Sequence, residues 1–64
     1  MTAYSFYVHD TRYSVPMLEF VMAQDLEAAK AMARRRLGER SHYTCIDVYE
    51  RDVLVASVAA AEAV

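Results

Sequence analysis

Four short segments of the chain have the hydrophobic patterns of β-strands, from apolar–polar alternation in the first to a segment that is apolar on both faces in the last. In the first of them, Tyr4, Phe6 and Val8 alternate with more polar neighbours. The four segments, each bounded by polar or turn-forming residues, are about 3–10, 16–23, 43–50 and 53–58. The pattern predicts strands there but does not define the order in which they pair.

Between the second and third segments, residues 25–37 have the composition of an amphipathic helix. Asp25 is predicted to cap its N-terminus, and Gly38 to end it in the left-handed conformation. At 3.6 residues per turn, one apolar stripe is formed by Leu26, Ala29, Ala33 and Leu37. Residues 1–64 are therefore predicted to form a single α+β domain of ββαββ order, in which one helix packs on one face of a four-stranded antiparallel sheet.

A single helix covers one face of such a sheet, so the alternation assigns each strand residue to a covered or an uncovered face. The residues predicted to lie under the helix are Tyr4, Phe6, Val8, Leu18, Phe20, Met22, Ile46 and Val48. The uncovered face is predicted to carry Tyr7, His9, Met17, Val21, Tyr43, Cys45 and Tyr49, with Val53 or Val55. An exposed face this apolar and aromatic indicates an interface.

Three occupants of the uncovered face are consistent with its composition. A second copy could stack on it in a symmetric dimer, or a different protein could dock there. The third is single-stranded RNA, whose bases stack on sheet aromatics in some RNA-binding domains. We disfavour RNA because these strands lack the basic residues expected beside such aromatics. We therefore expect no direct sequence-specific contact with nucleic acid.

Length, charge and cysteine content narrow the class of protein further. A chain of 64 residues buries only about 60% of its unfolded surface, so association with a partner would add stability. The net charge of −2 argues against a dedicated nucleic-acid binder. One cysteine, Cys45, cannot form an internal disulfide. No segment has the pattern of a signal peptide or a membrane helix, which predicts a cytoplasmic protein without membrane contact.

The chain contains few residues that could support catalysis or bind a metal. The candidate metal ligands are His9, Asp10, His42, Cys45 and Asp47. Their spacing matches no zinc motif, so we predict no metal site and no cofactor. A nucleophilic Cys45 needs a neighbouring base, but His42, three residues away along a strand, would lie on the opposite face. The sequence predicts that the protein is not an enzyme.

Several segments resemble small anti-CRISPR proteins of phages and mobile elements. These segments are an apolar strand leading into residues 23–33, the strand at 44–50, and the turn into 53–56. The resemblance implies direct docking on a multisubunit CRISPR surveillance complex in a bacterial host cell, without catalysis. Residues 4–10 and 25–29 also resemble short uncharacterised proteobacterial domains, which implies a fold and no function.

The sequence thus predicts a protein–protein interaction module, in its most specific form an inhibitor that docks on a CRISPR surveillance complex. The predicted partner-binding residues are Tyr7, Tyr43 and Tyr49 as apolar anchors, and Asp47, Glu50 and Asp52 as an acidic complement. The acidic residues would stand in for the phosphates that a nucleic-acid channel binds. The alternative is a cytoplasmic homodimer whose aromatic sheet face is used for self-association.

Overall fold

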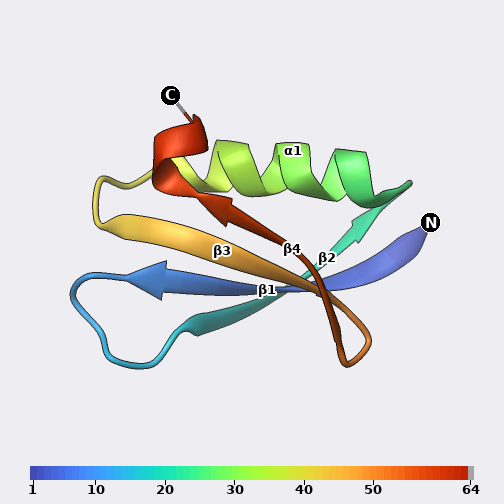
Figure 1. Cartoon of the computed structure of the whole chain (residues 1–64), viewed down its shortest axis with the longest axis horizontal. Helices are drawn as coiled ribbons and strands as arrows, with labels where there is room; N and C mark the ends of the chain where they lie inside the picture. Colours follow the sequence, from blue (N-terminus) through green and yellow to red (C-terminus); the bar gives the residue numbers. More distant parts are fainter. Residues whose placement is uncertain (64) are drawn as a thin grey trace.

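The computed structural model describes residues 1–63, with side chains for residues 1–61, and contains one antiparallel sheet and one α-helix (Figure 1). The strands are β1 (Thr2–Asp10), β2 (Met17–Ala23), β3 (Tyr43–Glu50) and β4 (Val53–Ala59). Helix α1 (Leu26–Leu37) follows β2, and a short 3-10 helix, η1 (Ala60–Ala63), follows β4. The order across the sheet is β2-β1-β3-β4. The predicted α+β class and ββαββ order are confirmed.

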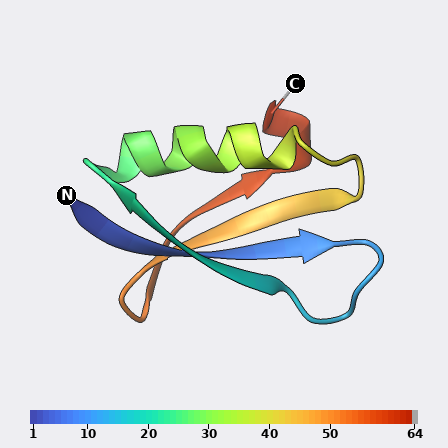
Figure 2. The same ribbon diagram turned by 180° about the vertical axis from the view of Figure 1, so that it is seen from behind.

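The helix lies along one side of a strongly twisted sheet, and η1 sits beside its C-terminal end (Figures 1 and 2). It takes the chain from the edge strand β2 to the inner strand β3, with β1 between them in the sheet. No other element of residues 1–63 lies on the opposite side of the sheet. That side is called the open face below.

Both ends of α1 are satisfied by local hydrogen bonds. The Asp25 carboxylate accepts from the backbone N–H of Ala28 at 2.9 Å, which confirms the predicted N-cap. The predicted left-handed conformation of Gly38 is wrong, because its φ is −72°. Its N–H instead donates to the carbonyls of Arg34 and Arg35, each at 3.2 Å. The helix therefore ends in a right-handed turn, in which its last carbonyls accept hydrogen bonds without any residue adopting a positive φ.

The hydrophobic core lies between α1 and the sheet. Ala29 and Ala33 are fully buried, and their small side chains let the helix backbone approach the strands closely. Phe6, at the centre of β1, is the largest of the fully buried side chains. Among residues 1–61, the buried residues are Tyr4, Phe6, Val8, Ala23, Ala29, Ala33, Leu37, Tyr43, Ile46, Val48 and Val58.

The predicted facing of β2 is wrong. Leu18, Phe20 and Met22 were expected beneath the helix, but they are 46%, 77% and 55% exposed. Phe20 pairs with Ser5 and Leu18 with Tyr7, all on the open face. The alternate residues of β2, which are Met17, Glu19, Val21 and Ala23, point to the helix side.

The reason is that β2 is apolar in both phases of its alternation. Because neighbouring strand residues face opposite ways, a change of phase by one residue reverses the whole strand. Glu19 is the one charged residue of β2, so its polarity favoured the outward assignment. Its partner Arg36, on α1, makes the inward position favourable instead.

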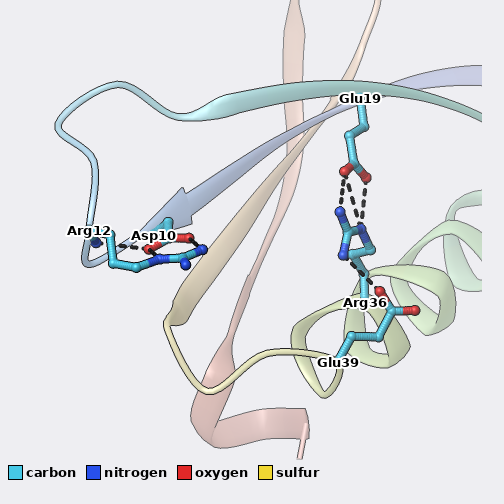
Figure 3. Close-up of polar contacts among 5 residues, drawn as sticks. All are labelled: Asp10, Arg12, Glu19, Arg36 and Glu39. Carbon is cyan, nitrogen blue, oxygen red and sulfur yellow. Dashed lines mark hydrogen bonds and ion pairs between the residues drawn. The ribbon is translucent and has the colours of Figure 1, made fainter.

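Arg36 joins the helix to β2 (Figure 3) and also contacts β3. Its Nε donates to Glu19 Oε1 at 3.0 Å, its Nη2 donates to Glu19 Oε2, and its Nη1 donates to Glu39 Oε1 at 2.7 Å. The guanidinium carbon also lies 5.1 Å from the centre of the Tyr43 ring. The hydrogen bonds to Glu19, more than any other contact, raise the pKa of Arg36, so this cation keeps its charge throughout the accessible pH range.

Tyr43 is a second correction, because it was expected on the open face but is only 6% exposed and lies on the helix side. His9 pairs with Cys45 and Asp10 pairs with Tyr43, which leaves Thr44 as an extra residue in β3. Such a β-bulge reverses the facing of the residues that precede it. Regular alternation would place Tyr43 on the same face as Cys45, and this is why Tyr43 was predicted on the wrong face of the sheet.

A further irregularity lies where β3 pairs with β4. Tyr49 pairs with Leu54, whereas Val48 pairs with Ala56, so Val55 is the extra residue. Leu54 thus occupies the open face, where Val53 or Val55 was predicted. Val55 packs against the core, and Val53 pairs with Glu50 on the helix side of the sheet, which makes that prediction wrong as well.

Candidate functional site

The candidate site is the open face, which is formed by the outward-pointing residues of all four strands. In sheet order it consists of Leu18, Phe20 and Met22 of β2, Ala3, Ser5, Tyr7 and His9 of β1, Cys45, Asp47 and Tyr49 of β3, and Leu54, Ser57 and Ala59 of β4. The antiparallel register places each of these residues beside its neighbour on the next strand.

An apolar zone crosses the open face from one edge strand to the other. Tyr7 and Tyr49 meet at its centre in a T-shaped contact, with ring centres 5.1 Å apart. Leu18 flanks Tyr7 on the β2 side, and Leu54 flanks Tyr49 on the β4 side. Scattered exposed apolar residues are ordinary, but a contiguous patch on a sheet face marks an interaction surface.

A polar row lies beside this apolar zone. His9 Nε2 is 2.9 Å from Asp47 Oδ2, and the Ser57 hydroxyl donates to Asp47 Oδ1, also at 2.9 Å. The row therefore joins β1, β3 and β4 through a single carboxylate. Cys45 pairs with His9 in the sheet, and its Sγ lies within 4.8 Å of the ligand atoms of both His9 and Asp47.

In the polar row, no hydroxyl or thiol nucleophile is hydrogen-bonded to the imidazole, as it would be in a nucleophile–base–carboxylate arrangement. The Ser57 hydroxyl is hydrogen-bonded to the carboxylate, whereas a serine nucleophile needs a base such as the imidazole beside it. Burial, followed by the charge of Asp47, raises the pKa of the Cys45 thiol. Cys45 is therefore a protonated and weakly nucleophilic thiol near neutral pH.

The open face has no Lys or Arg side chain among its residues. Its one acidic side chain, Asp47, is hydrogen-bonded to His9 and Ser57. Arg36 and Lys30 lie on the helix, and they pair with Glu19 of β2 and with Glu27 of α1, respectively.

The structure brings together half of the predicted partner-binding residues. Tyr7, Tyr49 and Asp47 lie on the open face, while Tyr43 is in the core. Glu50 and Asp52 are exposed around the β3–β4 turn, at the end of the open face nearest Tyr49. The sequence prediction did not assign Leu54 or the outward-pointing apolar residues of β2 to the open face. Both phases of β2 are apolar, and the bulge beside Leu54 cannot be recognised from the sequence pattern. The prediction also missed the hydrogen bond from Ser57 to Asp47, because a single serine in a strand carries no sequence signal for such a contact.

A separate hollow of about 290 Å³ lies near the β1–β2 connection, with Arg12, Arg40, Tyr13 and Tyr43 among its lining residues. Arg12 is already engaged there by Asp10, through two side-chain hydrogen bonds of 3.1 and 2.8 Å (Figure 3). These bonds are the main cause that lowers the pKa of Asp10 to about 2. Of the two arginines in the lining, Arg12 is therefore already paired with a carboxylate.

We expect the Asp10–Arg12 pair to make folding sensitive to acid. The pKa of Asp10 falls from 3.8 to about 2 in the folded protein, so the unfolded chain binds this proton more readily. The stabilisation is present above the ordinary pKa and is lost as the pH falls through the folded value. Urea unfolding of wild type and Asp10→Asn across this acid range should give a shallower pH dependence in the variant. Arg12→Ala should match it, and unchanged slopes in both variants would contradict this role.

Comparison with protein-family models, with curated proteins and with solved structures finds no match to this chain. The resemblance to small anti-CRISPR proteins therefore stays a prediction from the sequence. Within residues 1–63, no helix is long and apolar enough to cross a membrane.

Proposed function

We propose that this chain is a non-enzymatic interaction module whose open face binds the open face of a second copy. The observation that carries the proposal is the apolar zone that runs from Leu18 across Tyr7 and Tyr49 to Leu54, on a face without Lys or Arg. Tyrosine rings with an apolar body and a polar tip are suited to such contacts.

The charge of the open face favours a second copy over a foreign partner. In a two-fold symmetric dimer the same patch meets itself, so any net charge on it would face a like charge. Asp47 is the one acidic residue of the open face, and both of its oxygens are engaged within its own chain. Self-stacking therefore brings no free like charges together, and a charged partner would find little to pair with.

The small size of the domain supports the same occupant. A chain this short buries a small fraction of its surface when it folds alone, and association commonly supplies the missing stability. Phe20, Met22 and Leu18 are large apolar side chains that the monomer leaves in water. Their burial against a second copy would contribute roughly 25 cal/mol for each Å² removed from water.

A second candidate is the predicted inhibitor of a CRISPR surveillance complex. Exposed Glu50 and Asp52, close to Tyr49 at one end of the open face, support docking on a basic partner. Arg51 between them offsets part of this acidic charge. In this candidate the open face stays free until the foreign complex binds, so the isolated chain is a monomer.

Sedimentation velocity of the wild type and of Phe20→Glu tests the first candidate. We expect wild type to form dimers as concentration rises, and Phe20→Glu to weaken association about 100-fold or more, because it places an unpaired carboxylate in the interface. Val15→Glu is the matched control, since Val15 is also exposed but lies in the β1–β2 connection. A wild type that stays monomeric, or equal effects of the two variants, would count against the proposal.

The two candidates differ in a further result. A monomeric wild type that binds a purified CRISPR surveillance complex, and loses that binding in a Glu50→Lys and Asp52→Lys double variant, would favour the inhibitor. A dimer that fails to bind such a complex would favour self-association.

A further inference from the structure

The open face also gathers three side chains of the types that bind zinc. His9 comes from β1, and Cys45 and Asp47 come from the neighbouring strand β3. One ligand atom from each residue lies within 4.8 Å of the other two. In a tetrahedral zinc site, bonds of about 2.0–2.3 Å set neighbouring ligand atoms about 3.3–3.8 Å apart. Small side-chain rotations therefore suffice to bring all three atoms onto one ion.

The carboxylate of this group is held in a defined orientation. Ser57 donates to Asp47 Oδ1, which leaves Oδ2 directed at His9 Nε2, 2.9 Å away. A hydroxyl that donates to a ligating carboxylate is typical of the outer shell of metal sites. A bound ion would take the place of the hydrogen bond between His9 and Asp47, with the neutral imidazole of His9 carrying its proton on Nδ1 and ligating through Nε2.

The charges around the group also fit a divalent cation. No residue of the open face is Lys or Arg, so Asp47 has no permanent cation beside it. On binding, the Cys45 thiol would release its proton to solvent, and His9 would ligate as the neutral imidazole. One thiolate and one carboxylate then balance the two positive charges of the ion, which suits a site among apolar side chains.

We propose that His9, Cys45 and Asp47 bind a zinc-class divalent cation through Nε2, Sγ and Oδ2, with water as the fourth ligand. The nitrogen, sulfur and oxygen donors are those that Zn²⁺ accepts, and the sulfur disfavours Mg²⁺ and Ca²⁺. The site needs ligands from a single copy, so it does not depend on the proposed self-association.

Cobalt titration of the reduced, metal-free chain tests the site. Co²⁺ should bind one ion per chain with a thiolate-to-cobalt charge-transfer band in the near ultraviolet, and Zn²⁺ should displace it. Cys45→Ser should abolish the band. His9→Gln and Asp47→Asn should weaken binding about 100-fold or more, because even the loss of an outer-shell group commonly costs 10–100-fold.

His42→Gln is the matched control, since His42 is an exposed histidine outside the group. It should bind Co²⁺ like the wild type. His9→Gln keeps the test valid if Cys45→Ser fails to fold, because the His9 side chain is 37% exposed and replaceable without opening a cavity. Absence of the thiolate band in the wild type would overturn the proposal. Equal affinities of His9→Gln and the wild type would also overturn it.

Discussion

Replacing Phe6 by alanine is expected to lower the free energy of unfolding by about 3–5 kcal/mol. Phe6 is 1% exposed and belongs to the core between the sheet and the helix, so truncation removes buried apolar surface and leaves a cavity in the core. A domain of this size has a total stability of roughly 3–10 kcal/mol. The variant should therefore be close to unfolding at room temperature, as measured by urea denaturation followed by circular dichroism.

Phe20→Ala is the matched control, because it makes the same chemical change on the neighbouring strand. Phe20 is 77% exposed on the open face, so the substitution should change the unfolding free energy by less than about 0.5 kcal/mol. The comparison belongs at protein concentrations low enough to keep the chain monomeric, since association would add to the apparent stability. Similar losses in both variants would contradict the facing of β2 described above.

Replacing Arg36 by alanine is expected to lower the free energy of unfolding by about 2 kcal/mol. The substitution removes a bidentate pair with Glu19, a contact to Glu39 and the stacking over Tyr43, and leaves the Glu19 carboxylate half-buried without its partner. Charge-assisted hydrogen bonds contribute about 1.5–3 kcal/mol, and a partly exposed site lies toward the lower end. Thermal and urea unfolding of the variant provide the measurement.

Arg35→Ala is the control for this prediction, because Arg35 is the next residue of the same helix turn but is exposed. Its loss should cost less than about 0.5 kcal/mol. Arg36→Lys should fall between the two, since lysine keeps the charge but cannot form the planar two-point contact. If Arg36→Ala and Arg35→Ala lower the free energy of unfolding equally, the Arg36–Glu19 pair does not stabilise the packing of the helix on β2.

Local signals were sufficient to predict the elements of this fold. Asp25 caps the helix as expected, and the spacing of Ala29, Ala33 and Leu37 identified the buried stripe. The alternation in β1 is unambiguous, because Tyr4, Phe6 and Val8 alternate along the strand with more polar residues. It correctly predicts that these three side chains lie on the helix side of the sheet. The order of the strands could not be predicted, because it depends on contacts between segments distant in sequence.

The two faces of the sheet were harder to assign than its strands. In β2 the polarity of Glu19 suggested the wrong side, since its compensating partner Arg36 is 17 residues away on the helix. In β3 the bulge at Thr44 moved Tyr43 into the core. A bulge cannot be recognised from the alternation of residues within one strand. A face predicted from each strand separately is therefore wrong for the residues beyond a bulge.

The candidate site shows the same limit. Tyr7, Tyr49 and Asp47 were predicted to share a surface, and they do. The grouping of His9 with Cys45 and Asp47 was not predicted, because 36 residues separate the first two and zinc motifs are recognised by short spacings. It arises from the β1–β3 register, which the sequence pattern does not define.

The most direct test of the central claim is an isotope-filtered nuclear Overhauser experiment on a mixture of labelled and unlabelled chains, which detects only contacts between copies. Stacked open faces predict intermolecular contacts from the methyl groups of Leu18, Met22 and Leu54 and from the rings of Tyr7 and Tyr49. Intermolecular contacts confined to the exposed side of α1, such as Met32, would contradict the proposed interface. Their complete absence at millimolar concentration would contradict self-association itself.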